Sequence, residues 1–201
     1  MQSDLELASL LASRLCHDVV GPVGAIQNGL ELIAEDESMT EMAMDLIKKS
    51  AAQATAKLQY ARMAYGAAGG AEMLDPAEAG RLTAAMFEGE RANIDWRWSG
   101  AAQPRLQVKL AMLLATFALG AVPRGGTVTL VHSDETGLAI TAEGAAIRTP
   151  PFVELVTDGG DTQDPRAVQA LLIERFAAEI GWTVKADAGE TAMRFTTVPR
   201  G

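Results

Sequence analysis

In this 201-residue sequence, the type and neighbours of His17 point most directly to chemistry. Asp18 follows it directly, and Arg14 lies one helical turn before it. A neutral imidazole is a good nucleophile near pH 7 and can accept a phosphoryl group in line. An adjacent carboxylate can hold one ring tautomer, and a guanidinium can offset phosphate charge. These residues predict a phosphoryl-transfer site; the alternative is a solvated surface histidine with no function.

The residues around His17 have the spacing of an amphipathic helix. Apolar side chains recur at steps of three and four and form one stripe, which consists of Leu11, Leu15, Val19, Val23, Ile26, Leu30 and Ile33. His17 falls on the opposite side, where Ser13, Gly21 and Gly24 would leave room for another protein. Pro22 lacks an amide donor, so we expect a bend. Because proline and glycine each cost a helix about 1–3 kcal/mol, their presence favours a functional role.

Two overlapping motifs in this stretch carry a resemblance to known proteins. The run His17-Asp18-x-x-Gly21-Pro22 resembles the H-box in the dimerisation helices of histidine kinases. The longer string from Leu15 to Leu30 resembles the ChpT-type family of bacterial histidine phosphotransferases. That family is similar to the kinases in architecture but has lost ATP binding.

The resemblance implies a role for each residue of the motif. His17 would accept a phosphoryl group from the receiver-domain aspartate of a hybrid histidine kinase and pass it to response-regulator receiver domains. Asp18 would tune the imidazole and Arg14 would compensate charge. A docking floor would consist of Ser13, Val20, Gly21 and Gly24. The partner receiver would supply the aspartate and its magnesium ion, so no cofactor is expected on this chain.

Composition narrows the classes of partner and compartment. The net charge of −9 argues against binding to nucleic acid or to anionic membranes. The single cysteine, Cys16, excludes an internal disulfide, and we expect its thiol to pack in the core. Two histidines without clustered ligands make a metal site improbable. No signal peptide or membrane span is apparent, which favours a cytoplasmic protein.

The N-terminal part, residues 1–68, is predicted to be an antiparallel helical hairpin. Capping-box patterns at residues 3–6 and 38–41 start two helices that end near residues 34 and 64. One hairpin cannot bury both of its apolar faces, so we predict a homodimer with a four-helix bundle. The alternative is that the hairpin packs on its own C-terminal domain. Residues 66–70 are glycine-rich and are typical of a linker.

The remaining residues, 72–201, alternate between helical and extended patterns. Asp75-Pro76 starts a helix, and a longer one is expected over residues 104–121. Extended segments are expected at 94–98, 127–131, 138–142, 183–187 and 191–197, with short helices opening at Pro150-Pro151 and Asp164-Pro165. The overall class is α+β, and this domain is an α/β sandwich whose mostly antiparallel sheet is covered on one side.

The order of these elements resembles the ATP-binding domain of histidine kinases, but its nucleotide motifs are degenerate. Leu113 and Phe117 stand near the positions of two magnesium-binding asparagines. Ala142 and Ala146 replace the aspartate and the second glycine of the adenine motif, and residues 167–170, where the lid would be, contain no glycine. Without these groups we expect neither ATP binding nor autokinase activity.

The sequence thus predicts a histidine phosphotransferase in a two-component phosphorelay. Two alternatives belong to other classes of protein. One is an active ATP-dependent histidine kinase, which nucleotide titration would reveal. The other is a non-catalytic dimeric adaptor that only docks receiver domains, which would keep signalling after a His17→Ala substitution.

Overall fold

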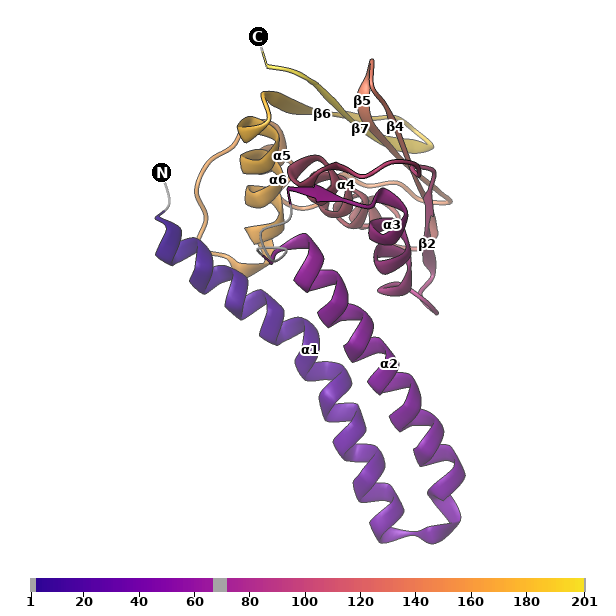
Figure 1. Ribbon diagram of the computed structural model, residues 1–201. Helices are drawn as coiled ribbons and strands as arrows, with labels where there is room; N and C mark the ends of the chain where they lie inside the picture. Colours follow the sequence, from indigo (N-terminus) through magenta and orange to yellow (C-terminus); the bar gives the residue numbers. More distant parts are fainter. Residues whose placement is uncertain (1–2, 67–71, 201) are drawn as a thin grey trace.

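The structure is a computed structural model that describes residues 3–66 and 72–200. A long helical hairpin extends from a domain in which helices cover one face of a sheet (Figure 1). The predicted linker falls largely on residues 67–71, outside the described residues.

The first helix, α1 (Asp4–Glu35), begins where its capping box predicts. The Ser3 side chain accepts a hydrogen bond from the Glu6 amide, and the Glu6 carboxylate accepts one from the Ser3 amide at 2.9 Å. These reciprocal bonds satisfy two amide donors that would otherwise lack partners. Pro22 lies inside the helix without ending it, and α1 curves along its length (Figure 1).

The second helix, α2 (Thr40–Ala64), follows a short 3₁₀ turn, η1 (Glu37–Met39). The capping box predicted at residues 38–41 is wrong, because Asp36 caps this turn instead. Its carboxylate accepts a hydrogen bond from the Ser38 amide at 2.9 Å. The polypeptide is therefore already helical when it enters α2, which carries no side-chain cap.

Small residues form the contact between the two helices of the hairpin. A Cβ on Gly29 would lie 2.6 Å from Ile47 Cγ1, so the helices approach closely there. The buried positions of the hairpin are Leu10, Pro22, Gly29, Ala43, Ser50, Ala54, Tyr60 and Ala64. The predicted apolar stripe is partly covered within one chain. Val23 is 51% exposed and Leu30 is 57% exposed, whereas its other members are half-buried: Leu11, Leu15, Val19, Ile26 and Ile33.

The C-terminal domain contains a five-stranded sheet in the order β2-β4-β5-β7-β6. Its strands are β2 (Ala92–Trp96), β4 (Gly126–Ser133), β5 (Gly137–Gly144), β6 (Trp182–Ala188) and β7 (Ala192–Pro199). The pair β2-β4 is parallel and the other pairs are antiparallel, which confirms a mostly antiparallel sheet. The sequence did not predict the small second sheet, in which β1 (Met73–Leu74) pairs with β3 (Gln103–Pro104).

Helices cover one face of this sheet and separate it from the hairpin (Figure 1). They are α3 (Pro76–Ala85), α4 (Arg105–Ala118), α5 (Val153–Thr157) and α6 (Val168–Glu179), with 3₁₀ turns η3 (Leu119–Ala121) and η4 (Pro165–Ala167). Fully buried Leu110 and Leu114 of α4 belong to one core with Ile140 and Phe195 of the sheet. The helix expected at Pro150-Pro151 begins later, at Val153, after a residue with positive φ.

The base of the hairpin packs on the C-terminal domain, whereas its far part does not (Figure 1). Tyr60 of α2 is buried between the two parts. Its hydroxyl lies 2.9 Å from Thr116 Oγ1 and donates to the Met112 carbonyl at 3.3 Å. The alternative interpretation of the sequence, a hairpin packed on its own domain, therefore holds for the base alone.

Candidate functional site

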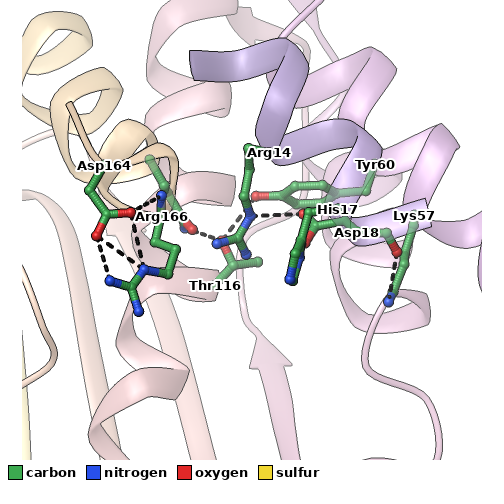
Figure 2. A network of polar contacts seen from close by, with 9 residues as sticks. Arg14, His17, Asp18, Lys57, Tyr60, Thr116, Asp164 and Arg166 are labelled. Atoms are coloured by element: carbon green, nitrogen blue, oxygen red, sulfur yellow. Dashed lines mark hydrogen bonds and ion pairs between the residues drawn. The ribbon is translucent and has the colours of Figure 1, made fainter. Parts of the chain in front are cut away.

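His17 lies on α1 with its side chain 83% exposed (Figure 2). At about 100° per residue, position 17 is about 140° from Pro22 and about 120° from Gly29, the residues that face α2. The ring is consequently turned to solvent, as the helical spacing predicts. Its Nδ1 lies 3.5 Å from Asp18 Oδ1, which leaves Nε2 as the nitrogen for an incoming group.

Asp18 connects the histidine to an arginine. Its Oδ2 accepts a hydrogen bond from Arg14 Nε at 2.9 Å, while Oδ1 faces the imidazole. Both partners of this ion pair are shielded, with side-chain exposures of 28% for Arg14 and 20% for Asp18. Much of the Arg14 charge is thus engaged by Asp18, so its main effect is to hold the carboxylate toward His17.

Two phenols, that of the buried Tyr60 and that of the partly buried Tyr65, lie close to this ion pair. Burial raises the pKa of Tyr65 to about 12 and raises the pKa of Tyr60 well above its usual range. The positive charge of Arg14 lowers both pKa values and so opposes these shifts, whereas the negative charge of Asp18 raises both pKa values and adds to them. Both phenols therefore stay neutral at physiological pH and add no charge next to Arg14 and Asp18.

The four predicted docking residues surround His17 on the exposed side of α1. Ser13 is exposed, with its hydroxyl donating to the Ser9 carbonyl at 3.0 Å. Val20 is 68% exposed. Cβ atoms added to Gly21 and Gly24 would meet nothing within 4 Å. No atom in the part of the chain that the structure describes obstructs this surface at the two glycines.

The prediction that the Cys16 thiol packs in the core is wrong, because Cys16 is exposed. At about 100° per residue it lies about 120° from Pro22 and about 140° from Gly29, outside the face that contacts α2. Free cysteine is usually buried, but here the neighbouring Leu15 is half-buried while Cys16 lies outside the face that packs on α2.

A groove of 380 Å³ runs between α1 and the C-terminal domain. Its lining combines charged, polar and apolar side chains: Arg14, Thr116, Phe117, Gly120, Pro150, Pro151, Phe152, Arg166 and Gln169. Arg166 is held by Asp164, with a shortest nitrogen–oxygen distance of 2.6 Å. Sequence reasoning missed this groove because it assembles distant segments. The apolar run at residues 150–152 was the signal that could have indicated part of it.

Residues at the positions of the degenerate nucleotide motifs are buried or hydrogen-bonded within the C-terminal domain. Leu113 and Ala142 are fully buried. Gln169 of α6 donates hydrogen bonds to the Leu113 carbonyl at 2.8 Å and to Thr116 Oγ1 at 2.6 Å. Within residues 3–66 and 72–200, no three histidine, cysteine or acidic side chains gather to hold a metal ion. None of the described helices has the length and apolar character needed to cross a membrane.

Comparison with known proteins gives concordant matches. Residues 76–192 match the model of the histidine phosphotransferase C-terminal domain. The chain is 39% identical over 193 residues to the protein phosphotransferase ChpT of Brucella abortus (strain 2308), covering 92% of each chain. The solved structure of a bacterial phosphotransferase is similar with a TM-score of 0.87 and 37% identity, covering 98% of each chain.

A histidine kinase domain from Erythrobacter litoralis is less similar, with 14% identity and a TM-score of 0.47 over 92% of this chain and 94% of that one. The phosphotransferase matches favour phosphotransfer in a phosphorelay over the kinase and adaptor alternatives. The chain belongs to the ChpT-type family of histidine phosphotransferases.

Proposed function

We propose that His17 is the phosphoacceptor and that it relays a phosphoryl group between receiver domains. The observation that carries this proposal is the exposed imidazole whose Nδ1 faces a carboxylate pinned by Arg14. In the first step, Nε2 attacks the phosphorus of an aspartyl phosphate. A nitrogen–phosphorus bond forms, the phosphorus–oxygen bond breaks and the receiver carboxylate leaves. The ring proton stays on Nδ1, opposite Asp18.

In the second step, a carboxylate oxygen of the response-regulator aspartate attacks the phosphorus of phosphorylated His17. A phosphorus–oxygen bond forms, the nitrogen–phosphorus bond breaks and Nε2 leaves with its lone pair, which restores the neutral imidazole. The magnesium ion for both steps belongs to the receiver, which supplies the acidic residues that hold it. Asp18 keeps the acceptor nitrogen oriented outward, and Arg14 keeps Asp18 in place. Because the donors and acceptors are receiver domains of intracellular signalling proteins, the proposed location is the cytoplasm.

In this proposal the receiver domain docks in two places. One is the docking floor, which consists of Ser13, Val20, Gly21 and Gly24, and the other is the groove beside Arg14, which contacts the side of the receiver domain. The unobstructed surface at both glycines supports the first part. The exposed guanidinium of Arg166 and the partly exposed ring of Phe117 support the second, since both line the groove. The C-terminal domain then acts as a docking wall.

The proposal includes a homodimer in which two hairpins form a four-helix bundle. Its support is the set of large apolar side chains that one chain leaves exposed on the hairpin, which includes Val23, Leu30, Met42 and Leu58. Several large apolar side chains exposed on one hairpin favour an interface with another protein surface. A Leu30→Glu variant should dissociate in sedimentation or light-scattering measurements. Asn28→Glu, at a nearby exposed polar position, should remain dimeric.

We further propose that the C-terminal domain does not bind ATP. The support is that Leu113 and Ala142 are buried and that Gln169 is bonded to α4 at the place where magnesium-binding amides would be expected. Calorimetric titration with Mg-ATP should show no heat of binding. Micromolar affinity would instead favour the kinase alternative.

The decisive experiment is incubation of the dimer with a phosphorylated receiver domain. We expect an acid-labile, base-stable phosphate on this chain that His17→Gln abolishes. The sequence offers a matched control, because His132 is the only other histidine. His132→Gln should be labelled as fully as the unmodified protein. Unchanged labelling of the His17→Gln variant would refute the assignment of the phosphoacceptor.

A further inference from the structure

The turn of α1 after His17 contains a carbonyl that its own helix cannot satisfy. In an α-helix the carbonyl of residue i accepts from the amide of residue i+4. Four residues after Asp18 stands Pro22, which has no amide hydrogen. The Asp18 carbonyl is therefore left without its helical donor, beside the residue that orients the imidazole.

A lysine from the other helix supplies the missing donor. Lys57 Nζ of α2 donates a hydrogen bond to the Asp18 carbonyl oxygen at 3.1 Å (Figure 2). Lys57 is partly buried. This is its one polar contact among the described residues, so its charge is not engaged by a carboxylate there. This hydrogen bond is charge-assisted, which makes it stronger than the backbone N–H hydrogen bond that the proline removes.

Asp18 is thereby fixed at both ends. Its backbone is held by Lys57, while its carboxylate contacts Arg14 at 2.9 Å and His17 at 3.5 Å. In Figure 2 the side chains of Arg14, His17 and Lys57 all point to the same side of the view. The position of Lys57 on α2 thus influences the orientation of the His17 imidazole on α1, through the Asp18 carbonyl.

We propose that Lys57 is a positioning residue for phosphotransfer, which replaces the amide missing at Pro22 and holds the turn that carries Asp18. This inference rests on the proposed function of His17. Pro22 and Lys57 form a compensating pair: the proline removes a helical hydrogen bond, and the lysine satisfies the carbonyl from outside the helix. Small displacements of an aligned group can slow a reaction by about a hundredfold, so the effect on transfer can be large while the fold persists.

The test is a double-mutant cycle on the full-length chain, with transfer from a phosphorylated receiver domain as the readout. Lys57→Met keeps the volume but removes the donor, and we expect kcat to fall about tenfold with little change in KM. Pro22→Ala restores an amide at position 22 and should transfer at close to the unmodified rate. The double variant Pro22→Ala/Lys57→Met should recover most of the lost rate, because the new amide satisfies the same carbonyl.

Two further variants keep the test sharp. Lys49→Met removes the same charge from an exposed position of α2 and should leave transfer unchanged. Lys57→Arg keeps a donor and should retain most activity, which gives a second comparison if Lys57→Met is poorly folded by circular dichroism. A double variant as slow as Lys57→Met, or a folded Lys57→Met with the unmodified kcat, would overturn the proposal. Failure of the unmodified chain to become labelled would instead refute the proposed function itself.

Discussion

Gly24 offers a substitution that should improve the fold and impair the function. It lies seven residues after His17, on nearly the same face of α1 and about 10 Å along the helix axis. A Cβ added there meets nothing within 4 Å. Glycine inside a helix costs about 1 kcal/mol relative to alanine. Gly24→Ala should therefore raise the free energy of unfolding by about 1 kcal/mol, which is a rise of about 2–4 °C in melting temperature for a chain of this size.

A larger side chain at the same position separates docking from stability. Glutamine is also a good helix former, so Gly24→Gln should keep most of the gain in stability. Its side chain would stand on the proposed docking floor, and KM for the phosphorylated receiver should rise about tenfold, a loss of about 1.4 kcal/mol in binding. Quenched-reaction assays of phosphoryl transfer at a series of receiver concentrations give KM and kcat. Differential scanning calorimetry gives the melting temperature.

Gly29 supplies the matched control in the same helix. There an added Cβ would lie 2.6 Å from Ile47 Cγ1 and 3.2 Å from the Ala43 carbonyl oxygen, so Gly29→Ala should lower the melting temperature. An unchanged KM for Gly24→Gln would refute the docking floor. A lower melting temperature for Gly24→Ala would show that another surface already covers this position.

Three other substitutions test separate parts of the chain. Gly80→Ala should destabilise the C-terminal domain by about 1–3 kcal/mol in urea unfolding, because its Cβ would lie 2.4 Å from Trp96 Cδ1. Burial lowers the pKa of His132 below 6.5, so the unfolded chain binds this proton more tightly. Stability therefore falls as the pH drops from the unfolded-state pKa of about 6.5 through the folded-state pKa, below which both states carry the proton. His132→Gln should flatten that dependence in unfolding curves between pH 7.5 and about 5. Asp18→Asn removes the charge opposite His17 Nδ1 and should slow phosphate labelling of the chain about tenfold. An unchanged rate would show that Asp18 does not contribute to the transfer.

The features that the sequence predicted well depend on neighbours within a few residues. The capping box at Ser3 and the helix start at Asp75-Pro76 are local, and the structure has both. The exposure of His17 follows from helical spacing alone. The second capping box failed for an equally local reason, since Asp36 accepts the hydrogen bond of the Ser38 amide and caps an earlier turn.

The features that were missed depend on which helix faces which. The exposure of Cys16 requires the inner face of the hairpin to be known, because position 16 is next in sequence to the half-buried Leu15 and yet lies outside that face. The contact of Lys57 with the Asp18 carbonyl depends on the register of α1 against α2 across 39 residues. The groove joins Arg14 to Phe152 and Gln169, which no local pattern brings together.

The contacts between hairpin and C-terminal domain decide what that domain can contribute. Tyr60 is buried at this boundary with its hydroxyl bonded to α4. Lys109 of α4, also buried, donates to the Gly66 carbonyl at the end of the hairpin. If the domain swung away, these groups would bond to water instead, and each hydrogen bond across the boundary would be lost at a net cost of about 0.5–1.5 kcal/mol. A domain held in this way cannot easily carry a nucleotide to His17. It keeps one wall of the groove beside Arg14 at a fixed place, where we propose that the side of the receiver domain docks.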